Sequence, residues 1–253
     1  MKQYSQYKNN DELWLPQIPA HWDSVKIKYL FDERVEKGFP DEPLLVAAQN
    51  MGVVPKHVYG NRTVEATKDL NLLKLVRVGD FVISLRSFQG GIEYAYYQGI
   101  ISPAYTIMVP RERIDPNYFR HLAKSRLFIE LLQMCVTGIR EGQNVDYETL
   151  KNHRIPVPPM EEQVRIAQYL DWKLNQIKGL IPYKDMTTYF SNSTAKFAKE
   201  ILLIAEYRTR LVSDVVTGQV DVRDVVIPEY ETVQEQADEE DDTFEDETEA
   251  EEE

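Results

Sequence analysis

Two short polar segments of the sequence carry residue types that can read DNA bases. Residues 84–91 and 137–144 each combine glycines with side chains that donate or accept several hydrogen bonds. Arginine pairs with the major-groove edge of guanine, and glutamine or asparagine pairs with adenine. Glycines let the backbone approach a phosphate closely. The candidate base-reading residues are Arg86, Ser87, Gln89, Arg140, Gln143 and Asn144.

A third group of polar residues, between positions 56 and 68, is richer in positive charge. Lys56 and Arg62 are candidate phosphate contacts, with His57, Asn61 and Lys68 beside them. Phosphate contacts position a protein on the duplex without specifying its sequence. Because most loops are polar, these residue types alone leave DNA contact open.

Residue patterns that would mark an enzyme are missing or badly placed. One cysteine and four scattered histidines do not supply the closely spaced ligands of a structural zinc site. No glycine-rich phosphate loop is found. Asp171 and Lys173 have the spacing of a nuclease metal site but fall inside a helical pattern, and the stretch 115–118 lacks the second proline of a methyltransferase base-holding loop. We therefore expect no catalytic residue, metal or cofactor in this chain.

The net charge of −13 is concentrated at one end of the chain. Of the 42 acidic residues, 15 lie in residues 229–253 with no Lys or Arg, which leaves 27 acidic against 29 basic residues in 1–228. Such an acidic block cannot collapse and is predicted to be disordered. It either keeps the protein soluble or mimics DNA in front of the protein's own basic surface. The polar start and the lack of about 18 consecutive apolar residues predict a cytoplasmic protein without a membrane span.

Residues 13–158 have the pattern of an α+β domain. Apolar runs at 81–85 and 104–109 are bounded by Gly79-Asp80 and by Pro110, which is typical of strands joined by tight turns. Asp115-Pro116 supplies an N-cap and a proline at the first helical position. One helix is expected to follow, with a buried side made of Tyr118, Leu122, Phe128, Leu131 and Leu132.

The proline-rich stretch 154–159 marks the boundary to a helical region. Apolar residues then recur at alternating spacings of three and four over 160–181 and again over 197–215, the pattern of a coiled-coil seam. This seam predicts a partner helix from a second copy or another protein, although a hairpin within the chain, turning at 182–184, is the alternative. Pro182 interrupts the helix, and Thr217-Gly218 ends it. The seam residues singled out for the partner helix are Leu170, Leu174, Ile177, Ile201, Ile204 and Leu211.

Several strings resemble the specificity subunits of type I restriction-modification systems, in the same order along the chain. Leu15 to Trp22 resembles the opening of a target-recognition domain, and Gly79 to Ser84 its Gly-Asp strand. Ile155 to Gln163 resembles the proline-rich entry to the conserved helix, and Tyr207 to Gly218 the end of that helix. The resemblance spans about residues 13–224, and the chain is identified as a half-size form with one recognition domain.

This resemblance implies a DNA-recognition subunit without catalysis of its own. Its partners would be double-stranded DNA, methyltransferase subunits, a restriction subunit and a second copy of itself, with S-adenosylmethionine, ATP and Mg²⁺ bound by the partner subunits. Two copies would read a bipartite inverted repeat. The implied organisation is a recognition domain in 1–158, a helical spacer and dimerisation region in 159–224 and a disordered acidic tail in 225–253. The alternatives are a regulatory protein that docks on the methyltransferase without reading DNA and, third, a self-sufficient nuclease.

Overall fold

The strands of the fold are short, and half of their pairings join strands that are not neighbours along the chain. The computed structural model describes residues 2–49, 51–59, 69–138, 143–178 and 195–228. The strands are β1 (Tyr7–Asn9), β2 (Gln17–Pro19), β3 (Asp23–Lys26), β4 (Phe31–Arg34), β5 (Leu45–Ala48), β6 (Gly52–Pro55), β7 (Lys74–Val76), β8 (Phe81–Ile83), β9 (Glu93–Tyr94), β10 (Gly99–Ile101), β11 (Thr106–Pro110), β12 (Val136–Thr137), β13 (Asn144–Val145) and β14 (Arg154–Val157).

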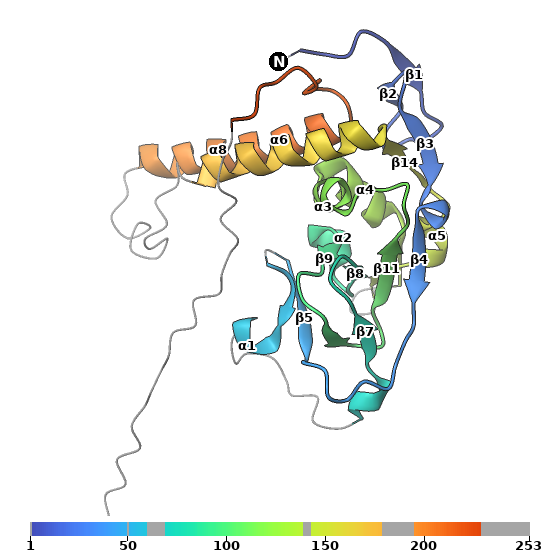
Figure 1. Ribbon diagram of the computed structural model, residues 1–253. Coiled ribbons are helices and arrows are strands. Elements are labelled where there is room, and N and C mark those ends of the chain that lie inside the picture. The colour runs from blue at the N-terminus through green and yellow to red at the C-terminus, as the bar shows by residue number, and fades with distance from the viewer. Residues whose placement is uncertain (1, 50, 60–68, 139–142, 179–194, 229–253) are drawn as a thin grey trace, which may run out of the picture.

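Helices cover one end of these strands and connect several of them. They are the 3₁₀ turns η1 (Ile27–Tyr29) and η2 (Leu70–Leu72), and the α-helices α1 (Lys56–Tyr59), α2 (Ser87–Gly90), α3 (Pro116–Leu122), α4 (Arg126–Met134), α5 (Tyr147–Leu150), α6 (Met160–Lys178) and α8 (Ala195–Val216). In Figure 1, α6 and α8 lie across the top of the strand-rich part, with α3 and α4 beneath them. None of the helices in these residues is long and apolar enough to cross a bilayer. The mixed α and β content agrees with the predicted fold class.

An antiparallel sheet in the order β4-β11-β8-β9 separates two apolar cores. Side chains alternate between the two faces of a strand, so Phe81 and Met108 enter the larger core under the helices, while Val82 and Ile107 enter a smaller core against the β5–β6 hairpin. All four side chains are fully buried. The sheet therefore links the helical end of the molecule to that hairpin.

The helix start predicted at Asp115 is confirmed, but the single helix predicted after it is wrong. Asp115 accepts a hydrogen bond from the Tyr118 amide at 2.8 Å, and α3 begins at Pro116. The helix ends at Leu122 because Ser125 caps a second helix, α4, by accepting from the amide of Phe128. The five side chains predicted to face the core are all 0% exposed.

The N-cap gives a first stability prediction. Asp115→Ala is expected to lower the free energy of unfolding by about 1 kcal/mol, because the Tyr118 amide loses its acceptor. Urea unfolding of the two proteins measures this difference. Asp115→Asn is the control, since asparagine also caps helices well, and an equal loss for both variants would contradict the capping explanation.

The two long helices form a hairpin within the chain, which was the alternative to the predicted partner helix. Figure 1 shows α6 and α8 side by side and running in opposite directions. The predicted seam residues Leu170, Ile177 and Leu211 lie in the chain's own core, Leu174 and Ile204 pack against it, and Ile201 is half-buried. The seam is covered within the chain, because α3 contacts both long helices and α4 contacts α8. The predicted turn at 182–184 and the interruption by Pro182 lie outside the described residues.

The C-terminal end of α8 returns to the start of the chain. Gly218 has a φ of +77°, and a Cβ there would lie 2.4 Å from Cδ of Pro19. Only glycine fits this left-handed position at such close approach. The Tyr118 hydroxyl lies between the carbonyl oxygens of Pro156 and Val216, at 3.1 and 3.0 Å, and its single O–H can be shared by the two acceptors. The predicted helix end at Thr217-Gly218 is confirmed, and the apolar core contains residues from both sides of the predicted boundary at residue 158.

Candidate nucleic-acid interface

The first predicted reading segment is a tight turn followed by the short helix α2. Arg86 and Gln89 are exposed, and the Arg86 guanidinium has no hydrogen-bond or ion-pair partner among the described residues. Ser87 is only 2% exposed, and its hydroxyl accepts from the amide of Ser84 at 2.9 Å. That hydroxyl closes the turn from inside, so we leave Ser87 out of the proposed reading set.

The second predicted segment lies between β12 and β13. Gln143 and Asn144 are exposed, whereas the predicted residue Arg140 lies outside the described residues. The Thr137 hydroxyl and the Asn144 side-chain oxygen are 3.4 Å apart across the two strands. This contact leaves the amide nitrogen of Asn144 free of partners in the described part of the chain.

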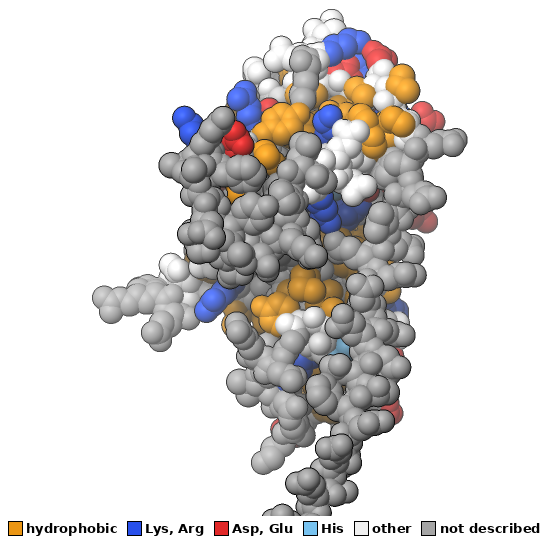
Figure 2. Space-filling view, turned by 90° about the vertical axis from the view of Figure 1, so that its left-hand side faces the viewer, with side chains coloured by type: hydrophobic (Ala, Val, Ile, Leu, Met, Phe, Trp, Pro, Cys, Tyr) orange, Lys and Arg blue, Asp and Glu red, His pale blue; other side chains and the backbone are white. Residues whose placement is uncertain are grey.

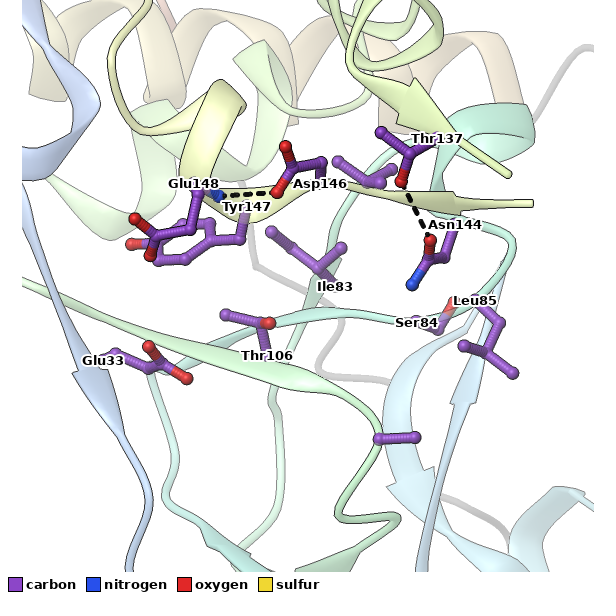
Figure 3. Close-up of a pocket in the computed structure, with 12 residues that line it drawn as sticks. Glu33, Ile83, Ser84, Leu85, Thr106, Thr137, Asn144, Asp146, Tyr147 and Glu148 are labelled. Atoms are coloured by element: carbon purple, nitrogen blue, oxygen red, sulfur yellow. Dashed lines mark hydrogen bonds between the residues drawn. The ribbon is translucent and has the colours of Figure 1, made fainter. Parts of the chain in front are cut away.

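The two segments converge on one hollow of about 310 Å³. Ser84 and Leu85 line it from the first segment, and Thr137 and Asn144 line it from the second, as Figure 3 shows. Helix α2 also contacts β13. Segments that are about 50 residues apart in sequence therefore present polar side chains side by side.

The opposite wall of this hollow is acidic. Glu33 and Glu148 line it together with Tyr147, whose pKa is raised to about 12 by burial and then by the charge of Glu33. Carboxylates repel phosphate but accept hydrogen bonds from the amino groups of cytosine and adenine. The hollow is therefore better suited to base edges than to the DNA backbone.

Lys56, from the third predicted group, is separated from this hollow by the length of the β5–β6 hairpin. Lys56 is half-buried at the start of α1, which follows the far end of the β5–β6 hairpin from its tip. Arg62 lies outside the described residues. Figure 2 shows lysine and arginine side chains scattered among hydrophobic ones on the face it presents. The structure thus brings the first two predicted segments together at the hollow, which of the predicted residues Asn144 lines, but it does not bring Lys56 there.

An ion pair between the half-buried Lys124 and the buried Glu93, next to α2, was not predicted from the sequence. Nζ of Lys124 lies 2.5 Å from Oε1 of Glu93, whose other oxygen is buried without a hydrogen bond in the described structure. Burial raises the pKa of Glu93 to about 7, against the opposing effect of Lys124. The same ammonium donates to the carbonyl oxygens of Gln49 and Gly90 at 3.1 and 3.0 Å. No sequence motif predicts this ion pair and its hydrogen bonds, because Lys124, Glu93, Gln49 and Gly90 belong to segments that only the fold brings together.

Histidine–carboxylate pairs occur away from the hollow and connect distant segments. In the described residues no serine or cysteine side chain is hydrogen-bonded to these histidines, and no group of three or more His, Cys, Asp or Glu could hold a metal ion. Burial lowers the pKa of His121. We interpret the pairs as structural. They are His21 with Glu162 at 2.8 Å, His121 with Asp171 at 2.9 Å and His153 with Glu12 at 2.8 Å.

A family comparison decides what kind of protein carries this surface. Residues 58–199 match the model of the type I restriction modification DNA specificity domain. The chain belongs to this family. The match includes α2, the strands β12 and β13, the whole of α6 and the first turn of α8. A comparison with curated proteins finds no match.

Solved structures of specificity subunits show weaker likeness to this chain. The HsdS subunit from Thermoanaerobacter tengcongensis is 17% identical, with a TM-score of 0.49 over 64% of this chain and 44% of that one. The S subunit of a type I restriction-modification system from M. genitalium is 16% identical, with a TM-score of 0.41 over 71% and 44%. A structure from a study of complex assembly in the type I system is 18% identical, with a TM-score of 0.46 over 80% and 47%. The chain spans less than half the length of these solved chains.

Proposed function

We propose that this type I specificity domain reads one half of a bipartite DNA site and directs a methyltransferase to it. The observation that carries the proposal is the convergence of the two predicted segments on one hollow, which Asn144 lines, with Arg86, Gln89 and Gln143 exposed on the same two segments. Residues 1–158 would form the reading part and insert these side chains into the major groove. Methyl transfer and ATP-driven cleavage would belong to partner subunits that bind S-adenosylmethionine, ATP and Mg²⁺.

The helical region 159–224 would connect the reading part to its partners. Leu202, Leu203 and Tyr207 on α8 are 69, 54 and 43% exposed. Large apolar side chains left exposed together on one helix support a docking role. The partners we propose are methyltransferase and restriction subunits and a second copy of this chain, which would make the DNA site an inverted repeat. Val225 and Ile227 pack against the apolar core, so the acidic tail predicted for 225–253 would begin after them and lie outside this assembly.

Co-expression with a methyltransferase subunit, followed by single-molecule sequencing of the host DNA, tests the proposal. A bipartite methylated motif is expected, and its symmetry reports whether two copies act together. A stable complex that produces no motif would contradict DNA reading and favour the regulatory alternative.

The exposed guanidinium of Arg86 gives the most direct test of the reading surface. Arg86→Ala is expected to relax the motif at one base pair, because a bidentate contact to guanine contributes about 1–3 kcal/mol of discrimination. Methylation rates on duplexes that differ at one position measure this loss. Arg126→Ala is the matched control, since Arg126 is an exposed arginine on α4 that pairs with Glu130 at 2.9 Å. Equal effects of the two substitutions would mean that Arg86 contributes only positive charge.

A further inference from the structure

The tip of the β5–β6 hairpin lies directly against α2. A Cβ placed on Gly90 would lie 2.3 Å from Nε2 and 2.4 Å from Cγ of Gln49. The Gln49 side chain therefore rests on the bare backbone of Gly90, next to Gln89. It is nevertheless exposed, and its carboxamide has no hydrogen-bond partner among the described residues.

Lys124 fastens this hairpin tip to α2. An ammonium group has three N–H donors and no acceptor, and Lys124 directs them to the carbonyl oxygens of Gln49 and Gly90 and to Oε1 of Glu93. All its donors are thus satisfied by three different segments. We call these three hydrogen bonds of Lys124 the clamp. Since Glu93, its carboxylate partner, is 97% buried, the clamp is anchored in the interior of the domain.

We propose that Gln49 is a further base-reading residue, and that Gly90 and Lys124 position its carboxamide beside Arg86 and Gln89. The proposal rests on the proposed function of this surface. A free carboxamide offers one acceptor and two donors, the set that pairs with N6 and N7 of adenine. Gly90 positions Gln49 because it has no side chain and leaves space for the carboxamide. Lys124 positions Gln49 by donating to its backbone carbonyl oxygen. Both are positioning residues in this scheme.

The shape of the contact allows the position of Gln49 to be changed without removing it. Gly90 lies in α2 and does not have a positive φ, so alanine is compatible with its backbone and favours the helix. In Gly90→Ala the new methyl group would occupy the space of the Gln49 amide, which must then swing away. Gln49→Ala removes the amide and leaves α2 unchanged.

Both variants, the double variant and the control Gln98→Ala are compared with the wild type in complex with the methyltransferase subunit. Gln98 is an exposed glutamine whose amide donates to Glu42 at 2.7 Å. The readout is the methylation rate on duplexes that carry each single-base change in the wild-type motif. Thermal unfolding of each variant reports separately on folding.

We expect Gln49→Ala and Gly90→Ala to lose about tenfold or more of their discrimination at one and the same base pair, with no further loss in the double variant. Gln98→Ala should keep the wild-type motif. An unchanged motif in Gln49→Ala overturns the inference while the proposed function stands. So does a change in Gly90→Ala alone, because the methyl group would then act on α2 itself. A wild-type complex that methylates no motif overturns both.

Discussion

Glu162→Ala is expected to lower the free energy of unfolding by about 4 kcal/mol, the largest effect on stability predicted for this chain. The Glu162 side chain is 7% exposed and accepts hydrogen bonds from the Tyr4 hydroxyl at 2.5 Å and from the Trp22 indole at 3.0 Å. Both donors are buried, and each would lose its acceptor at a cost of about 1–3 kcal/mol. His21 loses a partner as well. Urea unfolding followed by tryptophan fluorescence measures the loss.

Two further substitutions distinguish the stabilisation by the buried hydrogen bonds of Glu162 from the stabilisation by negative charge at the start of α6. Glu161→Ala removes a carboxylate from the same helical turn, but Glu161 is exposed, so we expect a loss below about 0.5 kcal/mol. Glu162→Gln keeps one acceptor oxygen and should lie between the two. Equal losses for Glu161→Ala and Glu162→Ala would show that helix-end charge, rather than the buried acceptor, stabilises the fold.

Local signals predicted where elements begin and end. Asp115-Pro116 predicted the start of α3, and Thr217-Gly218 the end of α8, because capping and left-handed glycine are properties of a few adjacent residues. The break at Ser125 was missed although its signal was present: a serine three residues before Phe128 can cap a helix. The spacing of apolar residues within 115–134 fits one continuous helix as well as it fits two helices.

The partner of the helical seam could not be decided from the sequence. A repeat of three and four predicts that one face of a helix is covered, but it does not say what covers it. In the structure, Leu211 and Leu170 face the chain's own core, and apolar exposure remains farther along α8, at Leu202 and Leu203. The proposed docking surface on α8 therefore differs from the apolar seam that the sequence predicted as the contact with a partner helix.

The candidate interface was predicted in part for a similar reason. Arginine and glutamine next to glycine marked 84–91, but no pattern links that segment to Gln49. Ala48 to Gly52 does contain the turn residues Asn50 and Gly52, which could have marked a hairpin tip. That the tip rests on Gly90 depends on how the β5–β6 hairpin packs on the central sheet, which is a property of the tertiary fold.

The buried pair behind the reading surface makes stability depend on pH with a definite sign. The pKa of Glu93 rises from 4.5 to about 7 because the carboxyl group is buried, with Lys124 acting in the opposite direction. The folded protein therefore binds a proton that the unfolded chain has already released between those two values. This contribution to stability is complete below about pH 4.5 and is lost as the pH rises through about 7. The buried Glu93 oxygen without a hydrogen bond supports this direction, since an ionised carboxylate requires more donors.

Glu93→Gln isolates this effect, because glutamine keeps an acceptor for Lys124 and does not titrate. From pH 5 to pH 8 the wild type should lose up to about 3 kcal/mol of unfolding free energy relative to the variant. Urea unfolding of both proteins at several pH values gives the difference directly, and groups that titrate in both proteins cancel in it. A wild type that instead gains stability relative to Glu93→Gln over this range would show that Glu93 is ionised throughout. Lys124 would then hold the hairpin tip and α2 through a permanent ion pair, and the clamp would be insensitive to pH between 5 and 8.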